Sequence, residues 1–179
     1  MSLRERARRI KMVLMDVDGI LTDGRLYYTE EGERLKVFSV HDGLGIKLLQ
    51  RAGILTGVLS GRESSALERR LRELGLDEIL MGRAEKGEVL EHLTRRRSIS
   101  EEEIAFIGDD LVDVPVLKRV GFPVTVASAP PEVRRVCVYV TLREGGNGAL
   151  RELADLILKL RGVHRELLEK YTGPAPTLK

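Results

Sequence analysis

The chain has 179 residues, which suits one domain with a well-developed core. Apolar residues make up 42% and charged residues 32%, a balance that excludes a disordered or membrane-embedded chain. The 30 basic and 28 acidic residues leave a net charge of +2, so there is no general attraction to nucleic acid.

Apolar, strand-like runs alternate with helix-like segments along the chain. In chain order we expect a strand at Lys11–Asp16, a β-hairpin of Arg25–Tyr28 and Leu35–Val40, a helix at Leu44–Ala52, a strand at Ile54–Leu59, a helix at Glu63–Leu74, a strand at Ile79–Met81, a helix at Glu85–Arg97, a strand at Ile104–Ile107, a helix at Leu111–Val120, strands at Phe122–Val126 and Val136–Val140, and helices at Asn147–Leu160 and Val163–Tyr171.

This alternation predicts an α/β fold in which a parallel sheet carries helices on both faces. We expect a single domain over residues 1–172, with the hairpin as a small flap at about residues 25–38 and a tail at residues 173–179. In such sheets the ligand site lies beyond the carboxyl ends of the strands. The polar signals fall there, since Asp16 and Asp18 follow the first strand, Ser60 the second and Asp109 a later one.

Two carboxylates stand two residues apart in the run Asp16-Val17-Asp18-Gly19. A bound cation would relieve their repulsion, and Mg²⁺ prefers oxygen ligands. Asp109 supplies a further acidic ligand from another strand end. We therefore predict a magnesium site at this edge of the sheet.

The same residues permit phosphate chemistry. An Asp carboxylate can attack phosphorus and form an acyl-phosphate, and Asp16 is the candidate nucleophile. Asp18 is placed to protonate the leaving group and then to deprotonate water. Ser60 can donate to a phosphoryl oxygen, and Lys86 can neutralise charge. Each motif alone is common as a turn or a helix cap, but their joint order at strand ends favours a site.

The four segments resemble the motifs of the haloacid dehalogenase-like phosphohydrolase superfamily. Asp16-Val17-Asp18-Gly19 matches the first motif, Ser60 the second, Lys86 the third and the run from Gly108 to Asp113 the fourth. The resemblance implies a Rossmann-like fold and a phospho-aspartyl intermediate. It also implies that Mg²⁺ is held by the side chains of Asp16 and Asp109 and the backbone carbonyl of Asp18. Asp110 and Asp113 would support this site from nearby.

A narrower resemblance, to the 3-deoxy-D-manno-octulosonate 8-phosphate phosphatases, covers nearly the whole chain. It is carried by the long first motif, residues 16–24, and by the late glycine-rich run, residues 145–152. This branch lacks a cap domain and forms homotetramers in which a neighbouring subunit helps to close the active site. The chain has no room for a cap domain between Asp23 and Ser60.

The same resemblance implies a set of substrate contacts to a phosphorylated sugar acid. They are Ser39, Val40, His41, Asp42, Gly43, Gly61, Arg62, Arg70 and Lys86. An arginine suits a sugar-acid carboxylate because its donors pair with both oxygens. His41 stands where the branch usually has arginine. The glycine-rich run Gly145-Gly146-Asn147-Gly148 is interpreted as a tight loop before a helix, bordering the neighbour's site.

Other functions remain open at this point. A nine-carbon sugar-acid 9-phosphate or another small phosphometabolite is an alternative substrate. A phospho-acceptor receiver-type signalling domain is the non-enzyme alternative, although an acid/base at Asp18 favours hydrolysis. Two arginine-rich runs, residues 4–9 and 95–97, lack accompanying aromatic residues and are interpreted as solvated helix faces, so no nucleic-acid partner is expected. With a single cysteine, no signal peptide and no membrane-length apolar run, we expect a cytoplasmic protein and no membrane partner.

Overall fold

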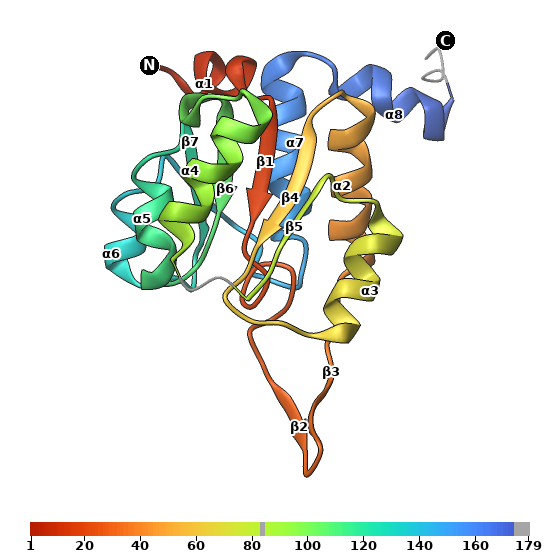
Figure 1. The fold of residues 1–179 in the computed structure, drawn as a ribbon. Coiled ribbons are helices and arrows are strands. Elements are labelled where there is room, and N and C mark those ends of the chain that lie inside the picture. The colour runs from red at the N-terminus through yellow and green to blue at the C-terminus, as the bar shows by residue number, and fades with distance from the viewer. Residues whose placement is uncertain (83–84, 174–179) are drawn as a thin grey trace.

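The computed structural model describes residues 1–82 and 85–173 and confirms the predicted α/β architecture. Six parallel strands form one sheet in the order β5-β4-β1-β6-β7-β8 (Figure 1). The strands are β1 (Met12–Met15), β4 (Leu55–Leu59), β5 (Glu78–Leu80), β6 (Ile104–Ile107), β7 (Phe122–Val126) and β8 (Tyr139–Thr141). A separate antiparallel hairpin pairs β2 (Tyr27–Thr29) with β3 (Gly32–Leu35).

Helices cover both faces of the sheet (Figure 1). From β1 the chain moves outward to β4 and β5, and from β6 it moves the other way to β7 and β8, so right-handed crossovers place the two sets of connections on opposite faces. One face carries α1 (Leu3–Arg9), α2 (Val40–Arg51), α3 (Ser65–Leu74) and α7 (Ala149–Arg161), and the other carries α4 (Lys86–Arg97), α5 (Val114–Leu117) and α6 (Pro131–Arg134). The last helix, α8 (His164–Thr172), packs on α7.

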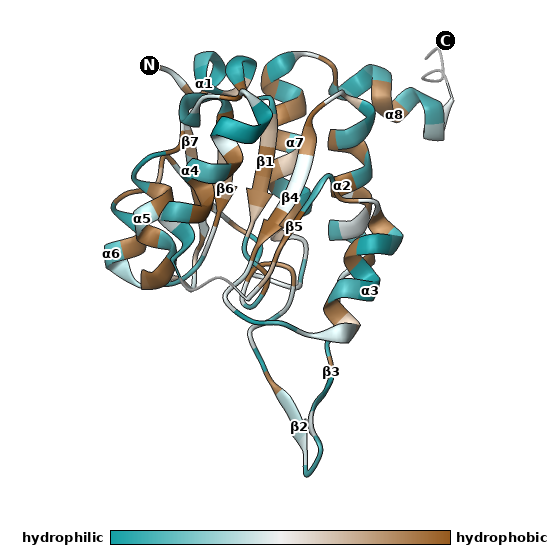
Figure 2. Ribbon diagram, in the orientation of Figure 1, coloured by the Kyte–Doolittle hydropathy of each residue, from teal (hydrophilic) through white to brown (hydrophobic). Residues whose placement is uncertain are grey.

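The core lies between the sheet and these helices, where Figure 2 shows the strands as mainly hydrophobic. All four residues of β1, the central strand, are fully buried, as expected for a parallel sheet covered on both sides. No helix of the described residues is long and apolar enough to cross a membrane.

Several element boundaries differ from the sequence prediction. Helix α2 begins at Val40 rather than Leu44, because the Ser39 side chain accepts a hydrogen bond from the backbone N–H of His41 at 3.2 Å and so caps the helix. The predicted helix at Leu111–Val120 is a 3₁₀ turn followed by the single turn of α5, which has a proline in its first turn. The predicted strand Val136–Val140 forms only from Tyr139, because the residues before it close the turn after α6.

The hairpin confirms the predicted insertion and projects beyond the carboxyl ends of the sheet strands (Figure 1). Its second strand is shorter and earlier than predicted, at Gly32–Leu35. No cap domain follows it, since the chain passes directly into α2. Of the predicted tail, residues 174–179 lie outside the described residues.

Candidate active site

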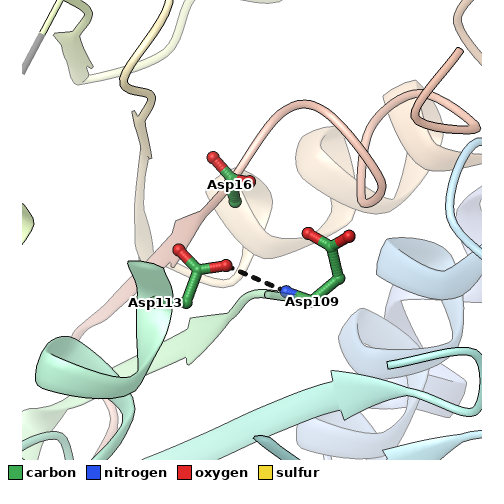
Figure 3. Close-up of side chains that lie close together, drawn as sticks. All are labelled: Asp16, Asp109 and Asp113. Carbon is green, nitrogen blue, oxygen red and sulfur yellow. Dashed lines mark hydrogen bonds between the residues drawn. The ribbon is translucent and has the colours of Figure 1, made fainter. Parts of the chain in front are cut away.

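Three carboxylates from two neighbouring strands meet at the carboxyl edge of the sheet (Figure 3). Met15 in β1 is paired in register with Ile107 in β6, so the residues that follow these strands, Asp16 and Asp109, emerge side by side. Asp113 follows four residues after Asp109. One oxygen of each carboxylate lies within 4.8 Å of the other two. The chain leaves β1 and β6 in opposite directions here, which is where ligands bind in open α/β sheets.

Lys86, the first residue of α4, joins two of these carboxylates. Its Nζ lies 2.8 Å from Oδ1 of Asp16 and 2.6 Å from Oδ1 of Asp113, and its side chain is only 3% exposed. Burial lowers the pKa of Lys86, but the charges of Asp16 and Asp113 outweigh it and leave that pKa above its ordinary value. The lysine therefore stays charged and fixes the orientation of the Asp16 carboxylate.

Asp113 is fully occupied by protein donors. While Oδ1 accepts from Lys86, Oδ2 accepts from the backbone N–H of Asp109 at 2.9 Å and from that of Asp110 at 3.3 Å. Asp110 is exposed, and its carboxylate caps the next turn by accepting from the N–H of Leu111. Asp113 thus shapes the loop that carries Asp109, and its oxygens are not open to a cation.

Asp16 and Asp109 remain as the pair that fits a divalent cation. Within residues 1–82 and 85–173, no hydrogen-bond donor reaches the buried Oδ1 of Asp109. Burial, with the nearby charges of Asp16 and Asp113, raises the pKa of Asp109 to about 7. Burial and the Asp113 charge also raise the pKa of Asp16 to about 6, although Lys86 opposes that shift. The negative charges of these two carboxylates are only partly neutralised, and one oxygen of Asp109 has no donor among the described residues. Such a pair matches the oxygen ligands that Mg²⁺ prefers.

Glycines let two loops approach this pair closely. At Gly19, φ is +91° and an added Cβ would lie 2.0 Å from Oδ2 of Asp109, so no side chain fits there. At Gly145, an added Cβ would lie 1.7 Å from the backbone oxygen of Gly19. The glycine-rich run therefore packs against the loop after β1 in the same chain, a role that the sequence did not indicate.

The second carboxylate of the first motif, Asp18, has partners from the hairpin. Its Oδ1 lies 2.5 Å from Nζ of Lys36, and its Oδ2 lies 3.6 Å from Nε of Arg62. Glu33 bridges these two cations, at 2.8 Å from Lys36 and 3.3 Å from Arg62, and the Tyr28 hydroxyl accepts from Arg62 at 2.9 Å.

Sequence reasoning missed Lys36, Glu33 and Tyr28. A signal was present, because Lys36 alternates with two apolar residues, Leu35 and Val37. The structure buries the lysine and exposes both apolar neighbours, the reverse of an ordinary solvent-facing strand.

Ser60 stands at the end of β4, on the other side of β1 from Asp109. It is 2% exposed, and its hydroxyl accepts from the N–H of Arg62 at 3.2 Å. Because Val58 is paired in register with Met15, Ser60 and Asp16 leave the sheet at the same edge. The Ser60-Gly61-Arg62 turn thus connects the edge of the site to the hairpin residues that Arg62 contacts.

Comparison with known proteins agrees with this geometry. Residues 78–153 match the family of haloacid dehalogenase-like hydrolases. The 3-deoxy-D-manno-octulosonate 8-phosphate phosphatase of Haemophilus influenzae is 42% identical over 160 residues, which cover 89% of this chain and 89% of that protein. The chain belongs to this family of haloacid dehalogenase-like hydrolases.

Solved structures of the family superpose closely on this chain. The 3-deoxy-D-manno-octulosonate 8-phosphate phosphatase of Moraxella catarrhalis, solved with magnesium, phosphate and 3-deoxy-D-manno-octulosonate (KDO), gives a TM-score of 0.91 at 39% identity, covering 94% of this chain and 97% of that one. A cobalt-bound phosphatase from Haemophilus influenzae gives a TM-score of 0.86 at 43% identity, covering 89% of this chain and 93% of that one. Family membership identifies an enzyme and sets the receiver-type alternative aside.

The substrate contacts implied by the family resemblance fall into two groups in the structure. Gly61 and Arg62 are exposed beside Asp18, and Lys86 contacts Asp16. The other group lies at the start of α2, where Val40 and His41 are exposed.

Asp42, in this second group, is hydrogen-bonded to the start of α7. Its carboxylate accepts from the N–H of Gly148 at 3.1 Å and from that of Arg151 at 2.9 Å, which places it at the beginning of α7. Arg70 lies over Gly43, where an added Cβ would meet its guanidinium at 2.8 Å. Contact of these residues with substrate stays a prediction.

Proposed function

We propose that this chain is a Mg²⁺-dependent phosphatase that hydrolyses 3-deoxy-D-manno-octulosonate 8-phosphate. The observation that carries the proposal is the placement of Asp16, which is oriented by Lys86 and lies beside the Asp109 carboxylate, whose Oδ1 has no hydrogen-bond partner among the described residues. Relatives at about 40% identity that are named as 3-deoxy-D-manno-octulosonate 8-phosphate phosphatases support this choice of substrate.

Asp16 is the nucleophile in this proposal. A carboxylate oxygen of Asp16 forms a bond to phosphorus as the bond to the sugar oxygen breaks, and water then cleaves the resulting aspartyl-phosphate. Asp16 and Asp109, with the backbone carbonyl of Asp18, would hold the Mg²⁺ ion. When bound, the ion neutralises the two carboxylates and the phosphate, which lets anionic groups approach one another.

Proton transfer falls to Asp18. It gives a proton to the departing sugar oxygen and later takes one from the attacking water. Lys86 and the Ser60 hydroxyl would stabilise the charge on the phosphoryl oxygens. Lys86 is already fixed by Asp113, so its ammonium needs little reorganisation as that charge develops.

Arginines beside this centre suit the sugar-acid end of the substrate. Arg62 is exposed next to Asp18, and its planar fork of donors pairs with a carboxylate. Arg70 would contribute at the start of α2, where it is half-buried and, within the described part of the chain, has Glu73 at 3.6 Å as its one acidic partner.

We further propose that the enzyme works as a homotetramer in which a second copy closes the site. The hairpin and the residues after it expose apolar side chains that a monomer would leave in water, which supports a protein partner on this side. They are Leu26, Tyr28, Leu35, Val37 and Val40, each of which is 43–74% exposed. Sedimentation should give a tetramer for the wild type and smaller species for Val37→Asp. A wild-type protein that remains monomeric at assay concentration would contradict this assembly.

The substrate proposal is tested by phosphate release with Mg²⁺ over a panel of esters. The panel holds KDO 8-phosphate, a nine-carbon sugar-acid 9-phosphate, simple sugar phosphates and nucleotides. We expect the highest kcat/KM for KDO 8-phosphate and no turnover in Asp16→Asn. Higher kcat/KM for another ester would overturn the substrate, and full activity of Asp16→Asn would overturn the mechanism.

A further inference from the structure

Lys36 is a buried cation placed by the hairpin against Asp18. Its side chain is 1% exposed although the hairpin around it is largely exposed. A lysine leaves water at considerable cost unless carboxylates replace its hydration. Here Asp18 at 2.5 Å and Glu33 at 2.8 Å do so. Among the residues that the structure describes, these two carboxylates are the only acidic partners of Lys36.

The contact singles out one oxygen of Asp18. Lys36 holds Oδ1, whereas the only cation of the described residues near Oδ2 is Arg62, whose Nε lies 3.6 Å away. A carboxylate anchored through one oxygen can present only the other to a substrate. An unanchored Asp18, whose side chain is 21% exposed at the sheet edge, would sample several rotamers.

We propose that Lys36 is a positioning residue that fixes Asp18 for its proton transfers. This inference rests on the proposed function. Glu33 pairs with both Lys36 and Arg62 and would keep these two cations beside Asp18. The hairpin would therefore hold the acid/base in place through several residues.

The competing interpretation is that Lys36 only anchors the hairpin to the domain. The two differ in how the effect of a mutation depends on the leaving group. A sugar alkoxide needs a proton in order to depart, whereas p-nitrophenolate departs without one. Loss of a positioned acid should therefore slow an alkyl phosphate much more than an aryl phosphate, while a general loss of structure slows both alike.

The experiment compares Lys36→Met with the wild type at saturating Mg²⁺, using KDO 8-phosphate and p-nitrophenyl phosphate. We expect kcat/KM for the sugar phosphate to fall by about 10- to 100-fold, within the range that general acid catalysis contributes. For the aryl phosphate we expect kcat/KM within about threefold of wild type, since this parameter ends at leaving-group departure. Its kcat should still fall, because water attack on the aspartyl-phosphate needs Asp18 as the base.

The matched control is Arg34→Met, in β3 two residues before Lys36. Arg34 is exposed, and its only acidic partner among the residues that the structure describes is the exposed Glu31. This variant should keep both substrates at wild-type rates. Equal losses of kcat/KM for the two esters in Lys36→Met would overturn the positioning role.

A double-mutant cycle keeps the test decisive if Lys36→Met folds poorly. In the background of Asp18→Asn, the milder change Lys36→Gln should cause no further loss on the sugar phosphate, because the group that it positions is gone. Independent, multiplicative losses would overturn the proposal. A wild-type protein inactive on KDO 8-phosphate overturns the substrate instead, and the same comparison then runs on an alkyl phosphate that it does hydrolyse. If it hydrolyses no ester, both proposals are overturned.

Discussion

Replacing Asp109 by asparagine should make the metal-free protein more stable and the enzyme inactive. The pKa of Asp109 rises from an ordinary 3.8 to about 7 in the folded state, mainly through burial. At about 1.4 kcal/mol per pH unit, ionising this group costs the fold on the order of 4 kcal/mol, and water that reaches the half-buried side chain lowers that figure. Asparagine has nearly the same shape and carries no charge.

The sign of the effect follows from proton linkage. Below pH 3.8 the carboxyl is protonated in both the folded and the unfolded chain, so wild type and variant should be equally stable. Between pH 3.8 and about 7 the folded state keeps a proton that the unfolded state has lost, and the stability of the wild type falls as pH rises. Above pH 7 the advantage of Asp109→Asn is complete.

Thermal unfolding in a chelator at pH 4 and pH 8 measures this difference. For a chain of this length, roughly 2–4 °C accompany each kcal/mol, so Asp109→Asn should melt up to about 10 °C above wild type at pH 8. Added Mg²⁺ should raise the melting temperature of the wild type but not that of the variant. Glu132→Gln, an exposed site on α6, is the control and should change neither. A variant that melts below wild type at pH 8 by the same margin as at pH 4 would refute the reasoning.

Two further predictions follow from contacts of the site. Lys86→Met leaves the Asp16 and Asp113 carboxylates without their cation, so the free energy of unfolding in urea should fall by roughly 3 kcal/mol at pH 8. The loss should be smaller at pH 5, where protonation of Asp16 removes one of the negative charges. An equal loss at both pH values would argue against an electrostatic origin. Gly145→Ala drives a methyl group into the backbone oxygen of Gly19 and should cost on the order of 2 kcal/mol together with most of the activity, whereas Gly87→Ala, which meets only ordinary contacts, should cost neither. A Gly145→Ala enzyme with wild-type stability and rate would show that the two loops need not touch.

The sequence predicted the sheet because local and global signals agree in it. Buried parallel strands are continuous apolar runs, and β1, β4 and β6 are each followed within two residues by a polar residue of the candidate site. Boundaries were less predictable where a side chain or a proline decides them. The Ser39 cap moved the start of α2, and Pro115 sits in the first turn of the short α5.

The site was predictable where one residue serves one local role. The positions of Asp16 and Asp109 could be predicted because each comes just after the end of an apolar strand. The pairing of Lys36 with Asp18 and of Gly145 with Gly19 depends on how distant loops fold back, which no local pattern encodes. Asp42 shows the converse, because a polar residue near the site is bonded to the start of α7.

Acid-quench trapping tests most directly whether Asp16 attacks phosphorus beside a shared cation. Enzyme mixed with substrate is quenched within one turnover, reduced with tritiated borohydride and digested. Hydride displaces phosphate from an aspartyl-phosphate and leaves labelled homoserine at that position. We predict homoserine at position 16 when Mg²⁺ is present and none in a chelator or in Asp109→Asn. Label at another residue, or trapping at Asp16 that is independent of both the ion and Asp109, would contradict the arrangement of nucleophile and cation.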